Sequence, residues 1–231
     1  MVVGDPVRLA ISVRPSPDTN DHEVVLVGDD QNLVERFGAG AIGLDPDDML
    51  IAPSPLLPAT PRQCLVGRCD CGVIGCGDVF VTIAVGPEFV VWSAIDEPRA
   101  PIHFVTSQYR SEVERAVGDH SWETQERTAA RLIRDGIDHL RLSANGLRFS
   151  WASGRVREGA MMVSLILDAG PYQVLVRIPG GGVEQPDRVA ATAIALLARA
   201  PQSWPEVDWL PQGGPLDAPS IAGPGWRRWR M

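Results

Sequence analysis

All four cysteines of this 231-residue chain fall within thirteen positions, in the stretch CLVGRCDCGVIGCG at residues 64–77. The spacing is C-x4-C-x-C-x4-C, and glycines stand between and beside the cysteines. Sulfur ligands of a zinc ion converge on the metal at about 2.3 Å, so the stretch must fold back tightly to form such a site. Glycine permits the bend because it adopts positive φ without a Cβ clash. The pattern therefore predicts a local turn in which thiols face one another.

The predicted ligands of a structural zinc ion are Cys64, Cys69, Cys71 and Cys76. Structural zinc sites usually combine two C-x2-C pairs, and this chain contains no C-x2-C. Cys69, Cys71 and Cys76 form the tighter group, whereas strand alternation can equally place Cys64 in a core. The fourth ligand is then Cys64, His103, Asp78 or a water molecule. Three alternatives to zinc stay open at this point: reduced structural thiols, one or two disulfides, and an iron–sulfur cluster.

The chain is acidic, with 29 Asp and Glu against 21 basic residues and a formal net charge of −8. Such a protein repels a phosphate backbone unless its basic residues gather in one patch, so nucleic acid is not an expected partner. The first residues lack the regions of a signal peptide, and no run approaches the ~18 apolar residues of a membrane span. We therefore expect a soluble cytoplasmic protein with no membrane partner, in a compartment where disulfides are rare.

The rest of the sequence predicts an α+β fold of antiparallel meanders with helices packed on one face. Apolar and β-branched runs predict strands at residues 7–13, 23–27, 78–85, 88–95, 146–153, 160–167 and 172–178. Capping residues and an Ala-rich run predict helices at about 107–117, 124–135 and 187–200. Gly86-Pro87 favours a hairpin, and the four prolines of residues 52–61 favour an extended connection.

An internal echo bears on the domain organisation. GPEFVVW at Gly86 and GPYQVLV at Gly170 are offset by 84 residues, and apolar strands and following helices align at the same offset. Either the chain contains two related α+β halves, or Gly-Pro hairpins recur by chance. We divide the chain into residues 1–120 with the cysteines, residues 121–203, and a Pro/Gly/Trp-rich tail at 204–231. We expect tryptophans of this tail to dock on the protein, although Trp beside Arg is also typical of interfaces.

The sequence contains no convincing motif of a known catalytic class. G-x-S-x-G and G-x-x-x-x-G-K-[ST] do not occur, and the four histidines show no H-x-H or i,i+4 pair. One G-x-G-x-x-G occurs at residues 38–43, but it follows no clear strand and leads into no long helix, so we interpret it as a loop. Asp45 before Pro46 predicts a helix cap rather than a cation site.

The run LVGRCDCGVIGCGDVFVTIAVGPEFVVWS resembles a stretch of uncharacterised bacterial, largely actinobacterial, proteins, in which a C-x-C-G knuckle is followed by a hairpin. The segments SWETQERTAARL and IAGPGWRR resemble further parts of the same group. The resemblance implies a bacterial, intracellular origin and implies no activity.

Three hypotheses for function follow. The first is a non-catalytic interaction protein that binds another protein and is stiffened by zinc. The second is an enzyme whose active residues lie far apart in sequence, which predicts a pocket with convergent titratable groups. The third is a thiol or metal sensor with reactive, accessible cysteines. We favour the first, because no catalytic signature occurs in a convincing context.

Overall fold

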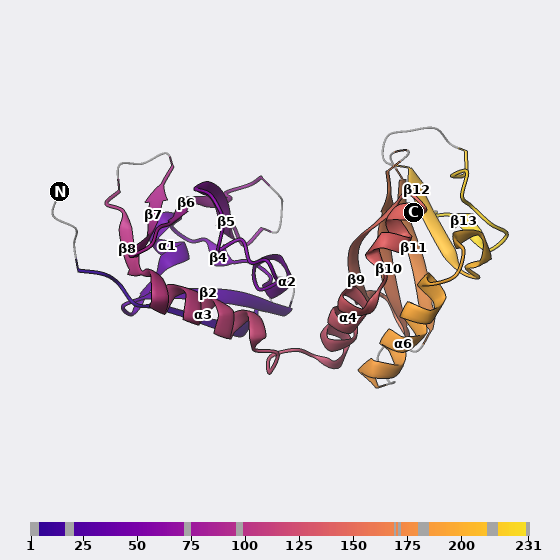
Figure 1. Ribbon diagram of the computed structural model, residues 1–231, viewed down its shortest axis with the longest axis horizontal. Coiled ribbons are helices and arrows are strands. Elements are labelled where there is room, and N and C mark those ends of the chain that lie inside the picture. Colours follow the sequence, from indigo (N-terminus) through magenta and orange to yellow (C-terminus); the bar gives the residue numbers. More distant parts are fainter. Residues whose placement is uncertain are drawn as a thin grey trace. The chain divides into compact units, whose positions relative to one another are not determined.

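The computed structural model describes residues 5–16, 21–71, 75–95, 99–168, 170, 172–179, 185–211 and 217–229. The chain divides into two compact units, unit 1 at residues 1–122 and unit 2 at residues 123–231 (Figure 1). The described residues form six α-helices and three sheets of mostly antiparallel strands, with about 27% helix and 39% strand. The predicted α+β class is confirmed.

Unit 1 begins with a three-stranded sheet. Its strands are β1 (Leu9–Ser16), β2 (Asp21–Gly28) and β3 (Gln31–Asn32), paired antiparallel in that order. Asp29 and Asp30 make the turn after β2 with positive φ angles of 43° and 69°. Helix α1 (Leu33–Phe37) follows at once, because the Asn32 side chain accepts the backbone N–H groups of Val34 and Glu35 and so caps the helix.

The second sheet of unit 1 has five strands in chain order. They are β4 (Ile42–Gly43), β5 (Arg62–Arg68), β6 (Val79–Val85), β7 (Phe89–Ala94) and β8 (Ile102–Val105). Strands β6 and β7 form the hairpin predicted across Gly86-Pro87. The short helix α2 (Pro46–Met49) carries the predicted Asp45 cap, and helix α3 (Thr106–Gly118) packs along β1 (Figure 1).

The core of unit 1 is built around a group of buried aromatic residues. Trp92 on β7 donates its indole N–H to the hydroxyl of Tyr109 on α3 over 3.1 Å. That hydroxyl in turn donates to the carbonyl of Leu56 over 2.9 Å. The proline-rich connection is therefore fixed to the core by a buried polar chain, since each polar group finds a partner.

Unit 2 is one five-stranded sheet with helices on one face. Its elements in chain order are α4 (Gln125–Gly136), α5 (His139–Ala144), β9 (Leu147–Arg157), β10 (Ala160–Leu167), β11 (Tyr172–Pro179), α6 (Pro186–Leu197), β12 (Val207–Pro211) and β13 (Trp226–Arg228). The sheet order is β13-β12-β11-β10-β9, so the predicted β9–β10–β11 meander is confirmed. Helices α4 and α6 pack together on the buried face (Figure 1).

Residues 204–229 contribute the last two strands of this sheet. Trp204 and Trp226 stack with ring centroids 6.0 Å apart and planes 9° apart. The indole N–H of Trp226 donates to the carbonyl of Pro201 over 3.0 Å. Trp209 is also buried in the core of unit 2. Tryptophan rings therefore hold this segment against the sheet.

The strand registers align the two similar hairpins at a different offset from the one given by their Gly-Pro dipeptides. In one hairpin Val85 pairs with Val90, and in the other Leu167 pairs with Tyr172. Equivalent ladder positions are thus 82 residues apart, whereas the dipeptides are 84 apart. Gly86 consequently follows its strand directly, whereas Gly170 lies three positions after Leu167.

Candidate metal centre

The cysteine-rich segment is the turn between two paired strands, β5 and β6. Gly67 pairs with Val79, so the ladder brings both ends of the turn together. Gly75 and Gly77 have φ angles of 82° and 71°, in the left-handed region that glycine adopts without strain. Residues 72–74, which include the predicted bend glycine Gly72, lie outside the described residues.

Three of the four predicted ligands come together in this turn. The Sγ atoms of Cys69, Cys71 and Cys76 all lie within 4.8 Å of one another. Sulfurs bound to one zinc ion at about 2.3 Å stand roughly 3.8 Å apart in a tetrahedron, so this group has the dimensions of a metal site. Cys71 and Cys76 are exposed and Cys69 is half-buried, which leaves the group open to solvent.

The thiols already interact without a metal. The Sγ atoms of Cys69 and Cys71 are 2.7 Å apart, and the Cys69 thiol also donates to the Cys76 carbonyl. The hydrogen bond with Cys71, followed by desolvation, raises the pKa of Cys69 to about 11. The Cys69 thiol is therefore protonated at neutral pH in this arrangement. A thiol poised for redox attack has the opposite shift.

Cys64 is not part of this group. It lies on β5 opposite Val81, is 3% exposed, and its thiol donates to the carbonyl of Pro55 over 3.1 Å. Burial raises the pKa of Cys64, as expected for a thiol held away from water. Strand alternation had offered a core position as the alternative for Cys64, and this is the position that Cys64 occupies in the structure.

The other two predicted ligands lie apart from the sulfur atoms. His103 is on β8, three strands from β5, where its ring packs edge-on against Phe89 with centroids 6.3 Å apart. Asp78 directly precedes β6, but its carboxylate is outside the group of mutually close ligand atoms. Within the described residues, the site therefore offers three sulfur ligands and leaves one coordination position to water or to another molecule.

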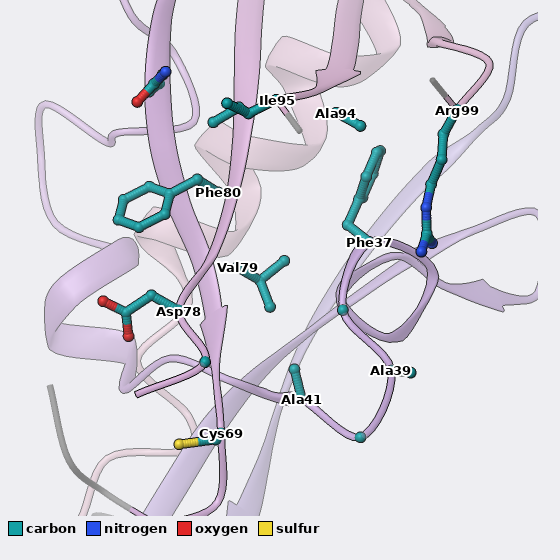
Figure 2. A pocket seen from close by; sticks show the side chains of 14 residues that line it. Phe37, Ala39, Ala41, Cys69, Asp78, Val79, Phe80, Ala94, Ile95 and Arg99 are labelled. Atoms are coloured by element: carbon teal, nitrogen blue, oxygen red, sulfur yellow. The ribbon is translucent and has the colours of Figure 1, made fainter. Parts of the chain in front are cut away.

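A cavity of about 440 Å³ adjoins the turn, and sequence reasoning missed it. Cys69 belongs both to the sulfur group and to the cavity wall. Figure 2 shows Phe37, Phe80, Ile95 and Arg99 around the same space. The Arg99 guanidinium donates to the carbonyl of Arg36, which ties this side of the wall to the end of α1. The signal available in the sequence was the G-x-G-x-x-G segment, since residues 38–41 form part of the wall.

The last glycine of that segment has a structural role. Gly43 donates its N–H to the buried carboxylate of Glu23 over 3.0 Å, and a Cβ at this position would collide with the carbonyl oxygen of Val24. Val24 also donates to the carbonyl of Leu44 over 2.8 Å, which joins β2 to β4. Gly43 therefore allows a close approach of two backbones, which the interpretation as a loop did not foresee, and the motif does not start a nucleotide-binding helix.

Comparison with known proteins adds no relative: no family model matches the chain, and neither the curated proteins nor the solved structures contain a match to it. None of the helices in the described part of the chain has the length and apolar character needed to cross a lipid bilayer.

Proposed function

We propose that the protein binds one zinc ion through the thiolates of Cys69, Cys71 and Cys76. The observation that carries the proposal is the convergence of these three Sγ atoms within 4.8 Å on a turn between paired strands. Thiolates favour soft or borderline metals such as zinc over magnesium or calcium. A cytoplasmic location agrees with the proposal, because thiols stay reduced there and keep their capacity to bind metal.

The open position and the exposure of the site favour a metal that exchanges with its surroundings. A closed structural site would bury four protein ligands, and in the described residues the fourth cysteine is in the core. Zinc would replace the contact between the Cys69 and Cys71 thiols and hold Cys69, Cys71 and Cys76 in one arrangement beside β6. The same change reaches the neighbouring cavity, because Cys69, Gly77 and Asp78 line it.

The test is metal content and affinity in matched cysteine variants. Protein purified under reducing conditions without added metal is analysed for zinc, and affinity is measured by competition with a chromogenic chelator. We expect one zinc per chain, and about tenfold or greater loss of affinity in Cys69→Ser, Cys71→Ser and Cys76→Ser. Cys64→Ser is the matched control and should keep full zinc. Stoichiometric zinc that survives all three turn substitutions would refute the proposal.

We further propose that the metal site supports binding of another protein rather than catalysis. Phe80 and Ile95 line the cavity beside Cys69 with 42% and 36% of their surfaces exposed. Exposed apolar side chains around a hollow are typical of interaction sites. A zinc-dependent change in the turn would then alter how this surface is presented to the partner.

A photo-crosslinker at position 80 tests the interaction. We expect one partner protein to be captured, and its capture to fall in Cys69→Ser and Cys71→Ser chains. The same crosslinker at position 140 is the control, since Leu140 is 85% exposed in unit 2. Equal capture of the same protein at both positions, or no effect of the cysteine substitutions, would count against this interaction.

A further inference from the structure

Unit 2 has a hollow lined by arginines from three strands. Two adjoining cavities of about 420 and 190 Å³ share Arg157, Asp208 and Arg227 in their walls. Arg228 and Trp229 complete the first cavity, and Arg177 and Glu206 belong to the second. We call this space the arginine hollow. It is elongated, because Arg228 and Arg177 stand in different cavities joined by the shared residues.

The hollow lies on the sheet face that α4 and α6 leave uncovered. Val176 and Val207 belong to the core under these helices and pair across β11 and β12. Side chains alternate along a strand, so the next residues, Arg177 and Asp208, point to the opposite face. Arg227 is the ladder partner of Asp208 on β13. Arg177 and Arg227 are therefore not part of the core packing, whereas Arg228 is the ladder partner of the core residue Trp209 and lies 5.9 Å from the centroid of its ring.

The charges of the hollow are only partly balanced. Arg177 pairs with Glu206 at 3.0 Å, and Arg157 is 3.7 Å from Asp208. In the described part of the chain, Arg227 has no hydrogen bond or ion pair, and the buried Nε of Arg177 has no hydrogen-bond partner. Three guanidinium groups, those of Arg157, Arg177 and Arg227, thus accompany two carboxylates, while the Arg228 guanidinium lies over the Trp209 ring. An anion with acceptor oxygens would supply both the missing charge and the missing hydrogen bond.

The distribution of charge along the chain sets this hollow apart. Unit 1 contains 8 arginines and 18 acidic residues, a formal charge of −10, whereas unit 2 contains 13 arginines and 11 acidic residues, a formal charge of +2. All 21 basic residues are arginine, and the chain has no lysine. The acidic chain therefore segregates positive charge into the unit that carries the hollow, as anion binding requires.

We propose that the arginine hollow binds a small ligand with two linked phosphate groups. Guanidinium presents planar pairs of donors that match phosphate oxygens, and guanidiniums at both ends of an elongated space suit two groups better than one. Arg157 lies 5.3 Å from the centroid of the Trp229 ring, which places an aromatic surface beside the phosphate subsites. The ligand is either a bare diphosphate or an organic diphosphate such as a nucleoside diphosphate, and these two differ only in their use of Trp229.

Calorimetric titration of the full chain with pyrophosphate, ADP, citrate and a poly-glutamate peptide tests the assignment. We expect saturable one-to-one binding of pyrophosphate or ADP that weakens as salt is raised. Arg227→Gln and Arg157→Gln should each weaken it about tenfold or more, which corresponds to loss of one charge-assisted contact. Arg199→Gln on an exposed part of unit 2 is the control and should bind within about twofold of the parent. Tighter binding of ADP that is lost in Trp229→Ala identifies an organic diphosphate, and equal binding identifies the bare group.

Three outcomes would overturn the assignment. They are no saturable binding of either diphosphate up to about 10 mM, equal or tighter binding of citrate or the peptide, and equal loss in the Arg199→Gln control. Circular dichroism of each variant checks the fold, and Arg227→Lys serves as a second variant. Lysine keeps the charge and loses the planar donor pair, so it should restore only part of the affinity.

Discussion

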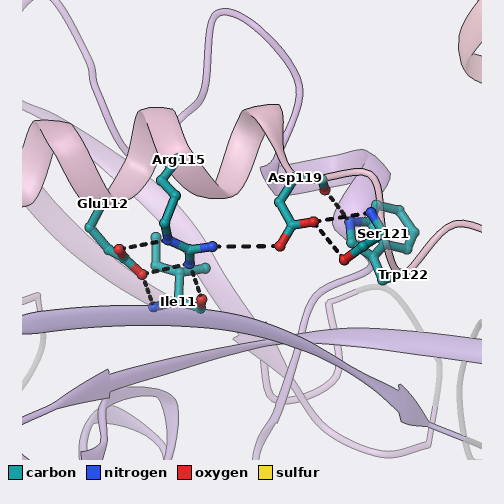
Figure 3. Close-up of polar contacts among 6 residues, drawn as sticks. All are labelled: Ile11, Glu112, Arg115, Asp119, Ser121 and Trp122. Carbon is teal, nitrogen blue, oxygen red and sulfur yellow. Dashed lines mark hydrogen bonds and ion pairs between the residues drawn. The ribbon is translucent and has the colours of Figure 1, made fainter.

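The side-chain amide of Gln108 on α3 occupies both backbone hydrogen-bonding groups of Leu9 on β1, which lies 99 positions earlier. Its oxygen accepts the Leu9 N–H over 3.1 Å and its nitrogen donates to the Leu9 carbonyl over 2.7 Å. One turn further along α3, Glu112 accepts the Ile11 N–H over 2.7 Å, and Arg115 donates to the Ile11 carbonyl over 2.6 Å (Figure 3). Helix side chains thus take the place of a neighbouring strand along the β1 edge, which would otherwise invite pairing with other chains.

The Gln108 contact predicts a measurable loss of stability in Gln108→Ala. The substitution leaves both polar groups of Leu9, which is 1% exposed, without their partner, at a cost of about 2–3 kcal/mol. Denaturant unfolding of the full chain measures the free energy of unfolding of unit 1. Arg110→Ala is the control on the exposed side of the same helix, and it should change this free energy by less than about 0.5 kcal/mol.

The Glu112–Arg115 pair predicts a dependence of stability on pH. The hydrogen bond from Arg115 lowers the pKa of Glu112 below the ordinary value of a glutamate. A carboxyl with a lowered folded-state pKa stabilises the fold above its unfolded pKa, and the contribution disappears as the pH falls through the folded value. Glu112→Gln should therefore be less stable than the parent at pH 7, and the difference should shrink below about pH 4.5. A difference between the two unfolding curves that stays constant from pH 7 to pH 3 would contradict this interpretation.

Two of the three glycines of the 38–43 segment, Gly40 and Gly43, predict substitutions of unequal cost. Alanine at position 43 would collide with the Val24 carbonyl, so Gly43→Ala should destabilise unit 1 by roughly 3 kcal/mol or more. Gly40 has a φ of 74° and open space where a Cβ would stand, so Gly40→Ala should cost only about 1–2 kcal/mol of backbone strain. Thermal unfolding of the pair gives the comparison. A Gly40→Ala chain that is the less stable of the two would refute the backbone-contact explanation.

The burial of Cys64 predicts two classes of thiol in metal-free protein. Cys69, Cys71 and Cys76 are accessible, whereas Cys64 is 3% exposed and its pKa is raised by burial. A chromogenic disulfide reagent should therefore label Cys71 and Cys76 rapidly in the native protein. It should label Cys69 more slowly, because the raised pKa of Cys69 leaves little thiolate, and Cys64 only after unfolding. In Cys64→Ser the class that is labelled only after unfolding should vanish, and the other three thiols should still be labelled in the native protein. Four equally fast thiols would mean that the β5 position of Cys64 is wrong.

The strands and helices that the sequence predicted are those with a clear local pattern. The β6–β7 hairpin and the β9–β10–β11 meander follow alternation and turn residues, and α4 begins after the capping residue Thr124. Strands β12 and β13 were missed because they lie in a Pro/Gly-rich segment and are formed by tertiary pairing, β13 parallel to β12. Local propensity carries no signal for a three-residue strand whose partner is 19 residues earlier.

The candidate site was predicted only in part, because a sequence shows local turns but not tertiary pairing. Sequence spacing brought Cys69, Cys71 and Cys76 together, because a short turn is a local matter. The spacing did not show that Cys64 lies apart from these three cysteines, because the position of Cys64 depends on which face of β5 packs against the core. The sequence offered the G-x-G-x-x-G segment as one part of the cavity wall beside Cys69. It could not show the cavity itself, because the other parts of the wall come from α1, β6 and β7, and sheet pairing brings these elements together.

The edge cover on β1 also has a consequence for synthesis of the protein. A ribosome delivers β1 and β2 roughly a hundred residues before Gln108, Glu112 and Arg115 emerge. During that interval the nascent hairpin presents bare amides and carbonyls that any extended chain can join. The cover of β1 can form only after Gln108, Glu112 and Arg115 have been synthesised, so unit 1 protects its first strand late in its own translation.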